Sequence, residues 1–307
     1  MAAHRLPGPL QARIEAMAGD LMRADGISVD FSAPAGAPAL AAPDSVSWRV
    51  FKNPIALFIG GVAAVLLELA EPKVRAGVWD HTSFRTEPVT RLKRTGLAAM
   101  VTVYAPRETA EAMIAGVGRR HARVRGVTEG GAAYAADDPD LLDWVQATAS
   151  YGFLHGYHRF VEPLPAADRD RFYAEAAPAA RLYGALNSPT NETELEQAFA
   201  AMTPRLEPSP VIREFLDIVR RTPALPSAMR LLQPMLVRAA VDILPDWARE
   251  RLELGAADGL AVWERPIVRA LGRAADRFVL ETAPPAQACV RMGLPADWLY
   301  RPRAEAA

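Results

Sequence analysis

The sequence predicts an all-α protein whose main body is a single large, bundle-like helical domain. Half of the 307 residues are hydrophobic, so the chain can bury a large core without cross-links. From Trp48 onward, apolar residues recur three and four positions apart in most windows, which is the period of an amphipathic helix. No alternating run predicts a strand, and no unit repeats along the chain.

Residues 1–44 are predicted to form an arm in front of this domain. Apolar residues recur at helical spacing over residues 8–24, so an amphipathic helix is expected there. Residues 32–44 read SAPAGAPALAAPD, and this Ala, Pro and Gly bias is typical of an extended linker. The helical domain is then expected to cover residues 45–307.

The first element of the domain, residues 54–67, is uncharged but only 14 residues long. A membrane-spanning helix needs about 20, and Glu68 and Glu71 follow at once, so a buried core helix is expected. Later helices begin with caps such as Asp138 before Pro139 or end at glycines such as Gly184. They are expected over residues 90–100, 105–126, 138–161, 166–184, 192–202, 210–221, 227–244 and 261–280.

Composition excludes several classes of function. A formal net charge of −1 disfavours nucleic acid as a partner. The single cysteine, Cys289, excludes an intramolecular disulfide and a cysteine-based zinc site. The N-terminus shows no secretory signal, so a cytoplasmic location is expected. The sequence has no G-x-S-x-G, phosphate-binding loop, dinucleotide-binding G-x-G-x-x-G or H-E-x-x-H motif, which argues against the common hydrolases and nucleotide enzymes.

Two pairs of polar residues are candidates for chemistry. Glu68 and Glu71 lie one helical turn apart after the longest apolar run, where two carboxylates could share a proton and act as acid and base. They could equally cap the helix and pair with Arg75. His155 and His158 have a spacing that two ligands of one metal can use, but no third ligand is evident, so surface or capping roles are the alternative.

The stretch GVGRRHARVRG, residues 116–126, places one histidine among four arginines. His121 follows Val117 at helical spacing, so its imidazole should face the core while most arginines need not. A buried histidine is commonly a hydrogen-bonded core residue. It is also the ligand that a haem iron requires, and nearby cations such as Arg125 suit the propionates.

Arg91, Arg94 and Thr95 are predicted to share one face of a helix. A solvated charged face is one interpretation of this pattern. The other is that these residues bind a partner anion.

Several segments, in order, resemble the latex-clearing protein (rubber oxygenase) and MpaB oxygenase family over roughly residues 46–255. They include LLELAEPKVRAGVWDHTSFRTEPVTRLKRTGLAAMVTVY, RRHARVRG, YAADDPDLLDWVQATASYGFLHGYHRF and RFYAEAAPAARLYG. The resemblance implies a globin-reminiscent helical fold that holds haem b. It also implies His121 as the proximal iron ligand, and Arg91 and Arg125 as residues that contact the cofactor.

The same resemblance implies a haem-dependent oxidoreductase that cleaves carbon–carbon double bonds of an apolar, isoprenoid-like substrate with dioxygen. Arg91, Arg94 and Thr95 would line the distal side, and Glu68 could act as an acid or base. This chain departs from the family pattern: Arg94 replaces a lysine, and Glu68, Glu71 and Gln146 stand where relatives have Gln, His and His. A haem-binding sensor or carrier without oxygenase activity, and a helical scaffold without haem, are therefore the alternatives.

Overall fold

The computed structural model describes Glu15 and residues 29–81, 83–225 and 227–301. The predicted all-α class is confirmed for these residues, since nearly all regular structure is helical. The helix expected over residues 8–24 lies outside the described part, apart from Glu15. The described α-helices are α2 (Val46–Phe51), α3 (Pro54–Glu68), α4 (Pro72–His81), α5 (Pro88–Tyr104), α6 (Arg107–His121), α7 (Pro139–Phe160), α8 (Ala166–Tyr183), α9 (Glu192–Met202), α10 (Pro210–Arg221), α11 (Gln233–Asp242), α12 (Asp246–Arg251), α13 (Glu264–Ala275) and α14 (Pro284–Arg291).

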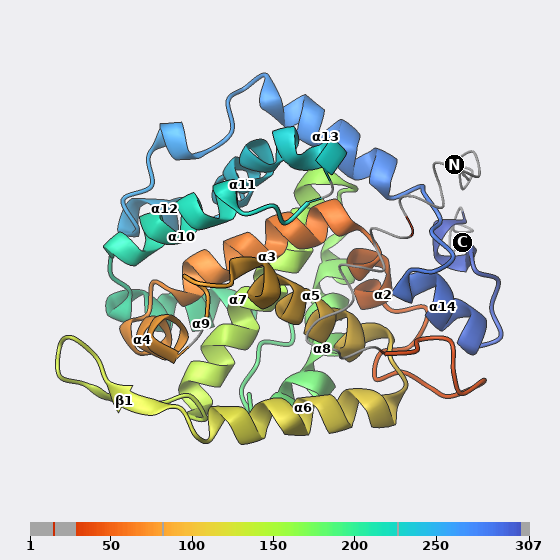
Figure 1. The fold of residues 1–307 in the computed structure, drawn as a ribbon, viewed down its shortest axis with the longest axis horizontal. Helices are drawn as coiled ribbons and strands as arrows, with labels where there is room; N and C mark the ends of the chain where they lie inside the picture. The colour runs from red at the N-terminus through yellow and green to blue at the C-terminus, as the bar shows by residue number, and fades with distance from the viewer. Residues whose placement is uncertain (1–14, 16–28, 82, 226, 302–307) are drawn as a thin grey trace.

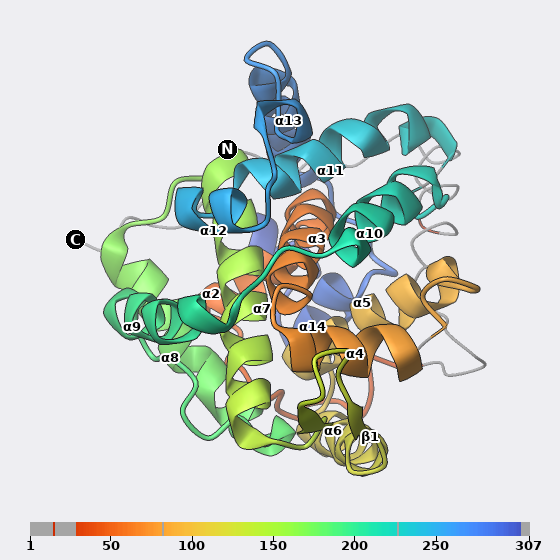
Figure 2. The ribbon, with the colours of Figure 1, turned by 90° about the vertical axis from the view of Figure 1, so that its left-hand side faces the viewer.

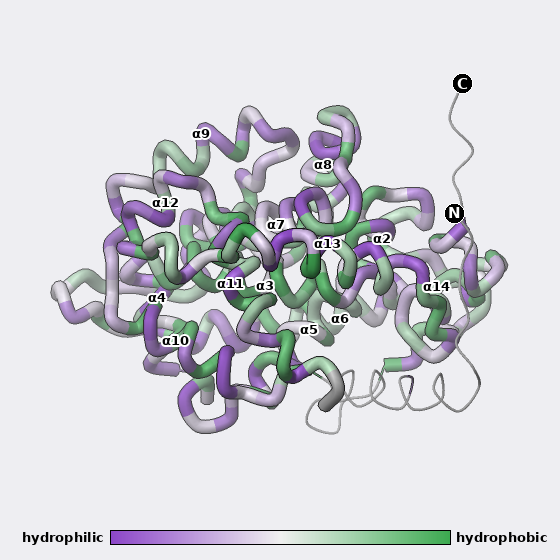
Figure 3. The backbone as a smooth tube through the Cα atoms, turned by 90° about the horizontal axis from the view of Figure 1, so that it is seen from above, coloured by the Kyte–Doolittle hydropathy of each residue, from purple (hydrophilic) through white to green (hydrophobic). Residues whose placement is uncertain are grey.

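Helices α3 and α7 form the centre of the molecule, and the other helices surround them (Figures 1 and 2). Asn53 starts α3, because its side chain accepts hydrogen bonds from the backbone N–H groups of Ile55 and Ala56, and Pro54 occupies the first position. Figure 3 shows hydrophobic segments gathered around this centre and hydrophilic ones toward the periphery. The expectation of a buried core helix over residues 54–67 is thus confirmed.

Glycines allow α3 and α7 to pack backbone against backbone. A Cβ atom on Gly60 would lie 2.5 Å from the carbonyl oxygen of Gly152, and one on Gly152 would lie 2.2 Å from that of Gly60. A Cβ atom on Gly156 would likewise lie 2.8 Å from the carbonyl oxygen of Ala56. No side chain larger than hydrogen fits at these positions, so the two helices form a closely packed pair.

Among the described residues, no single helix is long and apolar enough to cross a membrane. Helices α3 and α4 are long and apolar enough only when taken together, and they are bent by 113° relative to each other.

The prediction of a continuous helix over residues 105–126 is wrong at its C-terminal end. Helix α6 stops at His121, and the chain then forms an antiparallel hairpin of β1 (Arg125–Val127) and β2 (Ala133–Ala135). Gly131 turns the hairpin with φ +82°, a conformation that glycine adopts readily. Gly126 lies under the ring of Tyr134, where a Cβ atom would come within 2.6 Å of the tyrosine oxygen. Tertiary packing of these two residues therefore ends the helical pattern.

The segment expected to be an extended linker, residues 32–44, contains no helix or strand but follows bends and turns, and with residues 29–31 it packs on the body. Phe31 is buried in the core. Arg291 at the end of α14 is also buried, and its guanidinium donates hydrogen bonds to the carbonyl oxygens of Phe31, Ala37 and Tyr104. A buried charge needs such partners, so Arg291 fixes this segment to the domain.

Candidate functional site

Three helix ends bring Glu68, Arg91 and His121 into one electrostatic environment. Glu68 is the last residue of α3, Arg91 lies near the start of α5, and His121 is the last residue of α6. The positive charge of Arg91 opposes the rise that burial causes in the pKa of Glu68, and it adds to the fall that burial causes in the pKa of His121. Arg91 is therefore close enough to act on both, although the three residues are far apart in sequence.

His121 faces inward, as its spacing predicted. Ala110 and Ile114 on the same face of α6 are buried, and His121 itself is partly buried, whereas Arg119 and Arg120 are exposed. Burial lowers the pKa of His121, and the charge of Arg91 lowers it further. The imidazole is consequently held neutral at physiological pH. Its Nδ1 atom is buried and has no hydrogen-bond partner, which is an unfavourable state for a ring nitrogen unless a further group binds it.

Glu68 is a carboxyl group with an unusual pKa. Its side chain forms no ion pair in the described part of the chain, and burial raises its pKa from 4.5 to about 7, despite the opposing effect of Arg91. At neutral pH, both the protonated and the ionised form are populated. Such a group can accept or donate a proton under working conditions.

Arg91 and Thr95 form one unit on α5. Nη1 of Arg91 donates a hydrogen bond of 2.6 Å to the hydroxyl oxygen of Thr95, which in turn donates to the Arg91 carbonyl oxygen at 3.0 Å. Burial lowers the pKa of Arg91, and the like charge of Arg94 adds to this effect. Arg94 is itself exposed. Arg91, Arg94 and Thr95 thus share one face of α5, as their spacing predicted. Arg91 is partly buried there, and Thr95, like Arg94, is exposed.

Arg125 is placed differently from Arg91. It lies in β1 rather than on the helix of His121, its side chain is exposed, and it forms an ion pair of 3.1 Å with Asp137. Asp137 is also the group whose negative charge raises the pKa of His121. Arg125 and Asp137 therefore border the site together, with their charges largely balanced.

The structure separates Glu68 from Glu71. The Glu71 side chain is buried, and its carboxylate accepts hydrogen bonds from the backbone N–H of Val74 and from the guanidinium of Arg205, each at 2.8 Å. Arg75, the expected partner, instead pairs with Glu207. The hypothesis of two carboxylates that share a proton is therefore wrong. Glu71 caps α4, and Glu68 alone faces the site.

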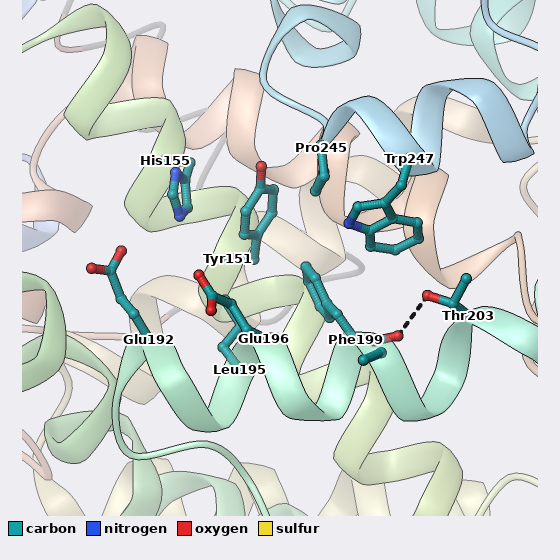
Figure 4. A pocket seen from close by; sticks show the side chains of 10 residues that line it. Tyr151, His155, Glu192, Leu195, Glu196, Phe199, Thr203, Pro245 and Trp247 are labelled. Carbon is teal, nitrogen blue, oxygen red and sulfur yellow. Dashed lines mark hydrogen bonds between the residues drawn. The ribbon is translucent and has the colours of Figure 1, made fainter.

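His155 and His158 do not form a metal site with other residues. No group of three or more potential metal ligands occurs within the described ranges. Nδ1 of His158 accepts a hydrogen bond from the backbone N–H of Leu164, which is the capping role that the sequence left open. His155 stacks on Tyr151 in a cleft of about 580 Å³. Figure 4 shows this cleft between α7, α9 and the start of α12. Apart from His155, its lining contains none of the candidate residues that the sequence suggested.

Three hydrophobic residues lie one helical turn from the predicted site residues. Val65 lies one turn before Glu68, Ala99 one turn after Thr95, and Val117 one turn before His121. All three are partly accessible rather than buried, and Val65 and Ala99 pack against the hydrophobic core. The sequence pattern cannot separate such residues from core residues, because both occupy the inward face.

Residues 48–277 match the family model described as the catalytic domain of ER-bound oxygenase mpaB/B′ and rubber oxygenase. The chain belongs to this family. The match covers the centre of the fold, from α2 to the end of α13, and includes every predicted site residue. Searches among curated proteins and among solved structures gave no significant match.

The residues of this oxygenase-family domain fit a haem in three respects and depart in one. A neutral imidazole with a buried, unpartnered nitrogen is an available iron ligand. Partly accessible apolar residues adjoin it, and the Arg91 cation is available to a carboxylate group. The departure is that ligation through the other ring nitrogen, Nε2, would leave Nδ1 without the carboxylate or carbonyl acceptor that metal-bound histidines usually have.

Proposed function

We propose that this oxygenase-family protein binds haem b through His121 and oxidises an apolar, alkene-bearing small molecule with dioxygen. The observation that carries the proposal is the neutral imidazole of His121, whose Nδ1 atom is buried and unpartnered, with Arg91 acting on both His121 and Glu68. When bound, haem supplies the dioxygen and electron-transfer chemistry that protein side chains lack. Oxidative cleavage of a carbon–carbon double bond is the reaction proposed.

The side chains of this chain supply binding, charge and proton control. His121 would hold the iron, since its neutral ring offers a nitrogen lone pair. Arg91, positioned by Thr95, keeps a positive charge beside the site and can bind a propionate or a substrate oxygen. Glu68 holds or releases a proton near pH 7. The partly accessible side chains of Val65, Ala99 and Val117 would contact a hydrocarbon substrate.

The first test is an absorption spectrum of the purified protein before and after addition of hemin. A Soret band with saturable hemin binding is expected, and oxygen consumption should start when an apolar alkene is added to the loaded protein. Absence of a Soret band after hemin addition would contradict haem binding. A band without alkene-dependent oxygen uptake would point to the sensor or carrier alternative.

Glu68→Gln is expected to change the pH dependence of stability. Since the pKa of Glu68 is higher in the folded protein than the ordinary 4.5, its contribution to stability is fully present below pH 4.5 and is lost as the pH rises through about 7. The glutamine variant does not ionise. Relative to wild type, its free energy of unfolding should increase by on the order of 2 kcal/mol between pH 4.5 and pH 8.

Urea denaturation of both proteins across this pH range measures the effect. The groups with lowered pKa values, such as His155, lose their contribution as the pH falls, but they are present in both proteins and cancel in the difference. Glu129→Gln, which changes an exposed carboxylate in the turn between β1 and β2, is the matched control and should run parallel to wild type. Parallel profiles for the Glu68→Gln variant would refute the proposed ionisation of Glu68.

A further inference from the structure

Helix α13 presents an apolar strip to solvent at the outer edge of the molecule. It lies on the periphery in both views, and the connection that leads into it forms the top of Figures 1 and 2. Val262 is 82% exposed and Trp263 65% exposed immediately before the helix, and Ile267 follows one turn later. Ala270 and Ala274 continue the exposed strip at helical spacing. Tryptophan so exposed is uncommon, because its large ring is usually buried.

The strip is not part of the face by which α13 packs on the body. Glu264, Val268 and Gly272 form that inner face and are buried. A Cβ atom on Gly272 would lie 2.5 Å from the Phe160 carbonyl oxygen of α7, so α13 is packed tightly there. The apolar strip lies on an outward flank. Because the inner face of α13 is tightly packed, loose packing does not explain why the strip is exposed.

A row of arginines runs along the other outward flank of α13. Arg265, Arg269 and Arg273 recur every four residues. Arg265 pairs with Asp242 at 2.9 Å. Arg269 and Arg273 are exposed and donate only to backbone carbonyl oxygens, those of Arg159 and Val161. Neither has a carboxylate partner in the described part of the chain, and Arg159 beside them is also exposed. The nearby acidic groups are occupied elsewhere, for example Glu162 by Arg49.

We propose that α13 and the preceding Val262 and Trp263 form a site that binds the surface of an anionic phospholipid bilayer. An interfacial helix carries an apolar strip with tryptophan, flanked by cationic side chains. The apolar strip would enter the acyl boundary, and Arg269 and Arg273 would meet the anionic headgroups. A second copy of the chain is a poorer match, since a stable protein interface takes about 20–30 residues from each partner and this strip is one narrow, projecting helix.

Vesicle flotation of the full-length protein tests this inference. We expect binding to phosphatidylcholine vesicles that contain phosphatidylserine, weaker binding to phosphatidylcholine alone, and loss of binding at high salt. Val262→Ser combined with Trp263→Ser should reduce the bound fraction roughly tenfold, because the apolar contribution is removed. Arg269→Gln combined with Arg273→Gln should abolish the preference for the anionic vesicles. These side chains are exposed, so the thermal midpoint should not change.

Two control variants separate this site from general stickiness. Leu186→Ser removes a side chain that is 61% exposed elsewhere on the surface, and Arg120→Gln with Arg123→Gln removes two exposed arginines of the His121 segment. Both should bind vesicles as wild type does. Equal binding by the Val262 and Trp263 variant would overturn the proposal. So would a dimer in sedimentation experiments that the same variant disrupts, because the strip would then be a protein interface. Neither result depends on haem, so this test is independent of the proposed function.

Discussion

Replacing His121 with alanine is expected to abolish the Soret band of the hemin-loaded protein or to shift it to the spectrum of weakly held haem. The imidazole lies within the electrostatic reach of Arg91, and its buried Nδ1 atom has no hydrogen-bond partner, so its loss removes the protein ligand proposed for the iron. Hemin affinity should fall at least about 100-fold, more than for loss of a residue that only supports a ligand. Hemin titration followed by absorption measures this.

Two companion variants make the result specific. His155→Ala removes another imidazole that burial keeps neutral, with a pKa near 4, but in the separate cleft of Figure 4, and it should bind hemin normally. His121→Gly should regain a six-coordinate or five-coordinate haem spectrum when free imidazole is added, since the added ring can occupy the space of the lost side chain. An unchanged spectrum for His121→Ala would leave haem binding possible but would remove His121 as the ligand.

Gly152→Ala is expected to destabilise the fold strongly. The new Cβ atom would lie 2.2 Å from the Gly60 carbonyl oxygen and 3.2 Å from the Ala64 nitrogen. Both atoms belong to the backbone of α3, so a side-chain rotation cannot relieve the clash, and α3 and α7 must move apart. A loss of about 3–5 kcal/mol is expected, measured by chemical denaturation.

Gly118→Ala is the matched control for this prediction. Gly118 is also helical, but it is exposed and has no atom within 4 Å of its ideal Cβ position. Alanine there should be neutral or should stabilise α6 by up to about 1 kcal/mol. A Gly152→Ala protein as stable as this control would show that α3 and α7 can separate without loss of packing. If the Gly152 variant does not fold, its insolubility beside a soluble Gly118 variant supports the predicted destabilisation.

Local patterns in the sequence were sufficient to predict the helical class and most helix positions. The helical period in the 138–161 window, with Asp138 as the cap, corresponds to α7, and the uncharged run after Asn53 corresponds to α3. These predictions succeed because caps, proline positions and the 3.6-residue period act within one element. The end of α6 was missed, because the hairpin that replaces its last turn depends on contact between Gly126 and Tyr134 across the β1–β2 pair.

The sequence by itself determined that His121 faces inward and that most of its neighbouring arginines need not, since both follow from helical spacing. Only the tertiary structure decided which charged residues meet it. Glu68 and Glu71 are equivalent in a sequence pattern, yet packing turns Glu71 into a cap held by Arg205 and leaves Glu68 partly buried without an ion partner in the described part of the chain. The pKa of a carboxyl group depends on burial and on charges from distant segments, which short-range patterns do not encode.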